Sequence, residues 1–102
     1  MIISIKHISE VNRIQNLVSS STGIKVSDIC SKSRKAEIVQ ARHISMYLCR
    51  WRTSINLFNI AKMHGKDNHA TVIHACTCIQ NDMRVNKKLA ALISELEFTL
   101  KS

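Results

Sequence analysis

The sequence has no proline and only two glycines, Gly23 and Gly65, among its 102 residues. These two residue types interrupt secondary structure most often, so the chain carries few obligatory breaks. Aromatic residues make up 4% of the sequence, too few for the base-stacking surface of a single-strand binder. No apolar run is long enough to cross a membrane. Since breaks are so few, the elements must be located from the spacing of apolar residues.

Acidic residues are also scarce. Seven Asp and Glu stand against fifteen Lys and Arg, which gives a formal net charge of +8. The excess lies in residues 25–66, which hold nine basic and two acidic side chains, whereas residues 67–102 hold four of each. This charge favours a polyanionic partner, and nucleic acid before membrane because no stretch offers a broad apolar insertion face. The alternative is a solvated basic surface.

The cysteines do not follow a disulfide or zinc-ligand pattern. Cys30, Cys49, Cys76 and Cys78 form no C-x-x-C pair, and three of them fall within apolar helical patterns. We therefore expect small reduced residues in or near the core. The N-terminal segment lacks the charged start, apolar stretch and cleavage site of a secretory signal, so we expect a cytoplasmic protein.

We expect no enzyme, metal site or cofactor. Gly65 and Lys66 lack the second glycine of a phosphate-binding loop. His69 and His74 are five residues apart, a poor spacing for metal ligands on one helical face. Cys76 or Cys78 as nucleophile with His74 as base would need to come together in space, with a third, orienting group that nothing in the sequence indicates.

Apolar residues recur at intervals of three and four along most of the chain, which predicts an all-α domain of about six helices. Residues Ile2, Ile3 and Ile5 are expected to form a short extended lead. The expected elements are a helix over 8–18 ended by the serine run 19–21 and Gly23, one turn over 26–30 capped by Ser27, a central helix over 36–51, a short helix over 57–63 capped by Asn56, a helix of about four turns from residue 68, and an amphipathic helix over 87–101.

A helix-turn-helix is predicted around Gly65. Two helices joined by a tight glycine turn have this layout, and the second helix enters the major groove with its N-terminal end first. Asp67 or Asn68 is expected to cap that helix. His69 is interpreted as a reader of a base edge, the alternative being an exposed first-turn histidine. His74 is either half-buried and bonded to a backbone carbonyl or in contact with a phosphate.

The segment "SKSRK", residues 31–35, is predicted to be a basic loop. Arg34, Lys32 and Lys35 are well placed to reach the sugar-phosphate backbone or a narrow minor groove beside the reading helix. They could equally be solvated loop charges. On the following helix, Arg42 is expected to point away from the apolar face.

Two stretches carry a family resemblance: "SKSRKAEIVQARHISMYLCR", residues 31–50, and "HATVIHAC", residues 69–76. Together they resemble the C-terminal DNA-binding domain, domain IV, of the bacterial chromosomal replication initiator family DnaA. The resemblance covers roughly residues 8–82 and is looser over the last helix. We expect residues 1–102 to form a single domain of this kind. It implies an all-α domain with a Trp-repressor-like helix-turn-helix that recognises a nonamer, the DnaA box, in duplex DNA at a replication origin.

The resemblance also assigns roles by position. It implies that the start of the recognition helix contacts bases and that the basic loop contacts the minor groove. It also implies phosphate contacts from residues near both segments. The residues are Asn68, His69, Ala70 and Thr71 for bases, Arg34 for the minor groove, and Lys32, Lys35, Arg42 and Lys66 for phosphates.

The sequence departs from the family at Lys66, Asp67 and Asn68, where the family commonly has glycine, a basic residue and aspartate. Aspartate only accepts, as from cytosine N4, whereas asparagine also donates and suits adenine N6 and N7. We therefore expect an altered preference at the base facing Asn68, or weaker binding.

The chain is too short to include the ATPase module of a full initiator. We expect either a domain of a longer initiator or a free-standing bacterial protein that acts at origin-like boxes on the nucleoid, as a competitor or local regulator. Two alternatives remain open. One is a helix-turn-helix transcriptional regulator without DnaA-box specificity. The other is a protein-interaction module whose last helix docks a partner helix.

Overall fold

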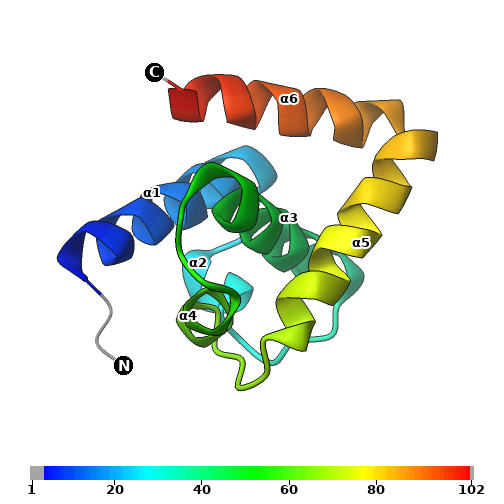
Figure 1. The fold of residues 1–102 in the computed structure, drawn as a ribbon. Coiled ribbons are helices and arrows are strands. Elements are labelled where there is room, and N and C mark those ends of the chain that lie inside the picture. Colours follow the sequence, from blue (N-terminus) through cyan, green and yellow to red (C-terminus); the bar gives the residue numbers. More distant parts are fainter. Residues whose placement is uncertain (1–3, 102) are drawn as a thin grey trace.

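The computed structural model describes residues 4–101, and within them it contains six α-helices and no strand (Figure 1). The predicted all-α fold of about six helices is confirmed. None of the helices in this range is long and apolar enough to span a membrane. The helices are α1 (Ile5–Thr22), α2 (Val26–Ile29), α3 (Ala36–Arg52), α4 (Leu57–Met63), α5 (Ala70–Val85) and α6 (Lys87–Lys101).

Helix α3 is the centre of the fold. It packs against each of the other five helices, most extensively against α5 and α1. Its buried residues Ile44 and Leu48 belong to one apolar cluster with Val11 and Val18 of α1 and Ile79 of α5. Figure 1 shows α5 rising from the turn after α4 to α6, which lies across the opposite end of the domain. The turn before α5 therefore projects away from α6.

Helix α1 is longer than its apolar spacing predicts. It begins after Ser4 and continues through the serine run to Thr22. The Thr22 hydroxyl donates to the Val18 carbonyl at 2.8 Å, and Gly23, with φ +78°, ends the helix in the left-handed conformation. The predicted stop at Gly23 is confirmed, whereas the predicted stop at the serine run is wrong, because residues 19–21 continue the helix.

Two smaller expectations also need correction. Of the predicted extended lead, Ile5 lies within α1, whereas Ile2 and Ile3 lie outside the described residues. The single turn of α2 begins after Lys25, with no side-chain cap, so the predicted Ser27 cap is wrong. Ser27 lies inside the turn, where its side chain is exposed.

Helix α6 is docked on its own domain. Leu89, Ile93 and Leu96 are buried in the common core. Arg13 of α1 donates to the Thr99 carbonyl at 3.2 Å, which places a positive charge at the C-terminal end of α6. The leucine-lined face that would have docked a partner helix is therefore already covered.

Candidate nucleic-acid interface

Helix α4, the turn over residues 64–69 and α5 form a helix-turn-helix. Asn56 caps α4, since its side chain accepts a hydrogen bond from the Asn59 amide at 2.8 Å. Gly65 has a φ of +76°, in the left-handed region that side chains disfavour. A Cβ at this position would overlap the carbonyl oxygen of Cys30, at the end of α2. The predicted cap and glycine turn are confirmed, and the turn packs directly against α2.

His64 is the buried residue at the start of the turn, and its ring bonds to α4 and α3. Its ring is fully buried, with Nδ1 at 2.8 Å from the Ile60 carbonyl and Nε2 at 2.7 Å from the Ser45 hydroxyl. Because a carbonyl only accepts, Nδ1 carries the proton and Nε2 accepts from Ser45. Burial lowers the pKa of His64 to about 4, so the ring is neutral at pH 7. This neutral pair ties the turn to α3.

The start of α5 is built around Asn68. Its Oδ1 accepts the Ala70 amide at 2.8 Å, and its carbonyl accepts the Thr71 hydroxyl at 2.8 Å. Of the two predicted caps, Asn68 thus satisfies a first-turn amide, whereas the Asp67 carboxylate lies 3.4 Å from Lys62 Nζ at the surface. The side chains exposed or partly exposed here are Asn68, His69, Ala70 and Thr71.

Serine hydroxyls order the loop between α2 and α3. Ser31 Oγ donates to the Asp28 carbonyl at 2.6 Å and accepts the Ser33 amide at 3.1 Å. Ser33 Oγ in turn accepts the Lys35 amide at 3.3 Å. These local bonds replace a helical ladder with successive tight turns. Three basic side chains of the loop are exposed, namely Lys32, Arg34 and Lys35.

Arg42 lies beneath this loop and is only 5% exposed. Its Nε donates to the Ile29 carbonyl at 2.7 Å, and its terminal nitrogens donate to the carbonyls of Ser33 at 3.1 Å and Asp28 at 3.3 Å. The prediction that Arg42 points away from the core is wrong, because backbone acceptors from another segment allow the guanidinium to be buried. In this geometry Arg42 joins the end of α2 to the basic loop.

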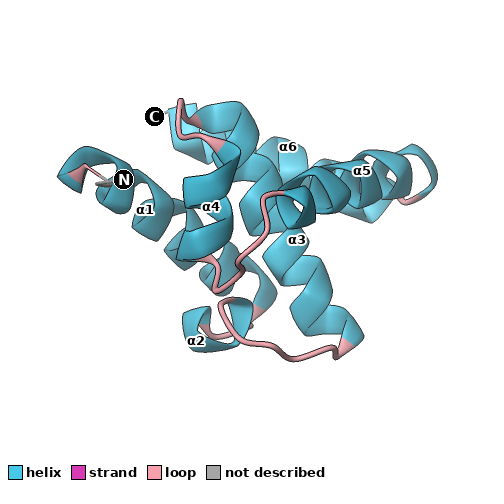
Figure 2. Ribbon diagram, turned by 60° about the horizontal axis from the view of Figure 1, so that its bottom comes forward, coloured by secondary structure: helices cyan, strands magenta, loops and turns pink. Residues whose placement is uncertain are grey.

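Lys66 connects the same loop to the turn before α5. Its Nζ donates to the Ser31 carbonyl at 3.4 Å. Burial lowers the pKa of Lys66, and the positive charges of Arg42, Lys32 and Arg34 lower it further. The basic loop and the start of α5, far apart in the sequence, therefore lie side by side in a positive field; Figure 2 shows the loop after α2 close to the turn after α4.

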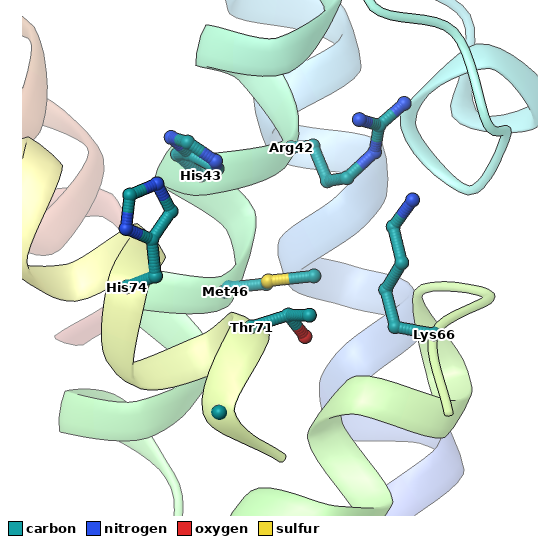
Figure 3. Close-up of a pocket in the computed structure, with 7 residues that line it drawn as sticks. Arg42, His43, Met46, Lys66, Thr71 and His74 are labelled. Atoms are coloured by element: carbon teal, nitrogen blue, oxygen red, sulfur yellow. The ribbon is translucent and has the colours of Figure 1, made fainter. Parts of the chain in front are cut away.

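A cleft with a volume of about 340 Å³ opens between α3 and α5, beside this turn (Figure 3). His43 and His74 meet on one side of it, with ring centroids 5.7 Å apart in a T-shaped arrangement. Sequence reasoning missed His43, whose sole signal is its position next to Arg42. The interpretation of His74 as half-buried and bonded to a carbonyl is wrong, since it is exposed and its Nε2 lies 3.4 Å from Cys78 Sγ.

The four cysteines are unpaired thiols, as predicted, and two of them are buried. Burial raises the pKa of Cys49 to about 12 and also raises that of Cys76, so both remain protonated at neutral pH. Within residues 4–101, no three His, Cys, Asp or Glu side chains come together as a metal site.

A family model matches most of the chain. The model for the bacterial DnaA protein helix-turn-helix matches residues 11–79, which include the basic loop and the start of α5. The chain is 38% identical over 91 residues to the chromosomal replication initiator protein DnaA of Bacteroides thetaiotaomicron. It is 35% identical over 85 residues to that of Aquifex aeolicus. These matches cover 89% and 83% of the chain but only 19% and 21% of the relatives, so the chain spans about a fifth of their length.

A solved structure shows the same arrangement. The crystal structure of a DNA replication initiation factor matches the chain with a TM-score of 0.83 and 33% sequence identity. The match covers 93% of this chain and 29% of that one. The fold is therefore shared over nearly all of this chain with less than a third of a longer protein.

Proposed function

The chain belongs to the family of bacterial DnaA helix-turn-helix domains, and from that membership we propose that it binds double-stranded DNA through α5 and the basic loop. The main support is the packing of Gly65 against Cys30, which holds the start of α5 beside the loop that carries Arg34. With this spacing α5 can enter the major groove while the loop reaches the adjacent minor groove.

Base reading is assigned to the start of α5. The outward groups there differ in chemistry. An imidazole and an amide can donate a hydrogen bond, the Thr71 hydroxyl, which donates its proton to the Asn68 carbonyl, can accept one, and a methyl group can contact thymine. Because Asn68 Oδ1 already accepts the Ala70 amide, the Nδ2 hydrogens are its principal groups for a base acceptor. The base-reading residues are Asn68, His69, Ala70 and Thr71.

The basic loop is assigned to the minor groove and the backbone. Arg34 is exposed at its tip and enters a narrow minor groove, where the negative potential favours arginine. Lys32, Lys35 and Lys66 contact phosphates. Arg42, predicted to do the same, acts through its hydrogen bonds to the loop backbone and so positions Arg34.

The proposed target is a DnaA-box-like duplex, and the proposed role is in chromosomal replication initiation or its regulation. The relatives are named chromosomal replication initiator proteins, and the matched region of this chain includes both segments that we assign to DNA. We propose that this domain acts without catalysis, in the bacterial cytoplasm, alone or as part of a longer initiator. Asn68, where the family commonly has aspartate, gives it a changed preference at one base pair.

Competition binding tests this function. A labelled DnaA-box duplex is displaced by unlabelled box or scrambled duplex at about 150 mM salt, where purely electrostatic binding is weak. We expect the box duplex to compete at least about a hundredfold better than the scrambled one. Equal competition, or no binding by either, would remove the sequence-specific function and favour a protein-interaction module.

Variants separate the base-reading residues from the phosphate-binding ones. His69→Ala should reduce the preference for the box while leaving binding to scrambled DNA unchanged. Lys32→Ala and Lys35→Ala should weaken binding to every sequence, and each should lower the salt dependence by about one unit because one phosphate is no longer neutralised. Identical effects from both kinds of variant would contradict these assignments.

A further inference from the structure

Three residues of α5 with metal-binding side chains follow one another at intervals of four, namely His74, Cys78 and Asp82. This spacing places them along one face of the helix, and that face is directed toward α3. His43 of α3 lies opposite, with its ring centroid 5.7 Å from that of His74. It also lines a hollow of about 310 Å³ together with Cys78 and Asp82. The five-residue spacing that argues against His69 with His74 does not apply to this set.

His74 and Cys78 already have the spacing of a chelating pair. The distance between His74 Nε2 and Cys78 Sγ is 3.4 Å. Zinc binds a histidine nitrogen at about 2.1 Å and a thiolate at about 2.3 Å, and at a tetrahedral angle these bonds place the two ligand atoms about 3.6 Å apart. His74 is exposed and Cys78 is partly exposed, so an ion in solution can reach both. Two ligands from one helix therefore need little movement to bind it.

His43 offers a third ligand from a second helix. Its ring meets that of His74 edge to face. In the part of the chain that the structure describes, no three donors surround one point as the side chains stand. A rotation of the His43 ring is therefore needed to complete the site. Burial lowers the pKa of His43, and so do the surrounding positive charges, which keeps the ring neutral at pH 7, the form that binds metal.

The charges around the rings are arranged in two groups. Asp82 raises the pKa of His43, so its carboxylate is near enough to attract a cation to this position. Arg42 and Lys66 oppose a cation, but they lie across the neighbouring cleft from both histidine rings (Figure 3). The side of the rings toward Asp82 is therefore the more favourable one for a metal ion.

We propose that His43, His74 and Cys78 bind a zinc-class divalent ion that bridges α3 and α5. Nitrogen and sulfur donors suit zinc, whereas Mg²⁺ and Ca²⁺ take oxygen ligands. The sulfur binds as the thiolate, so the thiol proton of Cys78 passes to solvent as the metal–sulfur bond forms. Three protein ligands leave one tetrahedral position for water. Because the ion binds the folded arrangement of the two helices, it stabilises the domain, and this role is independent of DNA binding.

Cobalt(II) titration of the tag-free chain under reducing conditions tests this site. We expect one ion per chain, with the near-ultraviolet charge-transfer band of a cobalt–thiolate bond and the strong visible bands of four-coordinate cobalt. Zn²⁺ should displace the cobalt and remove both sets of bands. Zn²⁺ should also raise the temperature of thermal unfolding, whereas Mg²⁺ at the same concentration should have neither effect.

Variants assign the ligands. Cys78→Ser and Cys78→Ala should each abolish the charge-transfer band. His74→Gln and His43→Gln should each weaken cobalt binding by at least about tenfold. The matched controls are Cys30→Ser, which removes another partly exposed thiol, and His7→Gln on α1. Both controls should titrate like the wild type, and circular dichroism without metal shows which variants keep their helices.

The outcomes are distinct. Absence of a charge-transfer band with the wild-type chain would overturn the site. A band that survives both substitutions of Cys78 assigns the metal to another thiol and overturns the site equally. If His43→Gln leaves the affinity unchanged, α3 contributes no ligand and the bridge between the two helices is wrong. None of these results depends on whether the chain binds a DnaA-box duplex, so the two proposals fail separately.

Discussion

The carbonyl oxygen of Cys30 lies so close to Gly65 that a Cβ at position 65 would overlap it. This contact joins the turn before α5 to the end of α2 and hence to the basic loop. Lys66 also links the two segments, since its Nζ donates to the Ser31 carbonyl. Arg42 stabilises the end of α2 by donating to the Ile29 carbonyl. The two segments assigned to DNA are therefore parts of one unit rather than separate appendages.

Gly65→Ala should disrupt this junction, whereas Gly23→Ala should not. Both glycines have positive φ, +76° at Gly65 and +78° at Gly23. A Cβ added at Gly65 would overlap the Cys30 carbonyl oxygen, whereas one added at Gly23 would meet no atom within 4 Å. Denaturant unfolding should show a loss of about 1 kcal/mol for Gly23→Ala, from the left-handed conformation alone, and more than about 3 kcal/mol for Gly65→Ala. Equal losses would show that the contact with Cys30 has no energetic role.

Arg42→Lys should act on DNA binding through Arg34. A lysine keeps the charge but cannot reach three backbone carbonyls with one planar group, so the basic loop loosens. In a double-mutant cycle on a box duplex, Arg34→Ala should cost much less in the Arg42→Lys background than alone. Additive effects would instead favour a direct phosphate contact by Arg42. Arg50→Lys, at the other end of α3, is the control and should leave the Arg34 contribution intact.

Stability should fall as the pH drops below about 6.5. The pKa of His64 is about 4 in the folded protein and near 6.5 when unfolded, so between these values the unfolded chain binds a proton that the folded chain does not. The stability lost across this window is about 3 kcal/mol from His64 alone. It should be measured by denaturant unfolding at a series of pH values.

His64→Gln is the test variant, because an amide can donate to Ile60 and accept from Ser45 without titrating. The variant should lose most of the slope between pH 6.5 and 4. A smaller slope should remain, since burial also lowers the pKa of His43. His7→Gln should keep the full slope, and a His64→Gln variant with an unchanged slope would contradict the buried neutral ring.

Asn68→Asp should shift the preferred base at one position only. The carboxylate can still cap the Ala70 amide, so the helix start is preserved. It cannot donate to a base, however, and discrimination at the facing base pair should change by about 1 to 3 kcal/mol. Measured affinities for a set of single-base variants of the box would give this value. A uniform change at all positions would show that the substitution acts only through the added negative charge and that Asn68 reads no base.

The helix-turn-helix could be predicted from the sequence because its signals are local. Asn56 caps α4 through a residue three positions on, and Gly65 specifies its own backbone conformation. The basic loop is likewise marked by serines and exposed cations within residues 31–35. Local chemistry of this kind is visible in a single sequence.

The buried polar residues could not be predicted, because their partners lie far along the chain. Arginine is usually found at the surface, and the burial of Arg42 depends on hydrogen bonds to the carbonyls of Ile29 and Asp28. His64 depends on Ser45, nineteen positions away. His43 and His74 approach each other only because α3 and α5 pack together. Such pairs follow from tertiary packing and carry no periodic signal.

Selection from a randomised duplex library tests the central claim most directly. The wild-type chain should enrich one motif with two parts, a core read by α5 and a neighbouring A·T-rich segment read by Arg34 in the minor groove. Arg34→Ala should keep the core and lose the preference for the A·T-rich segment, whereas His69→Ala should lose the core. Recovery of no enriched motif by the wild-type chain, at a salt concentration where it still binds DNA, would contradict sequence-specific recognition through α5 and the basic loop.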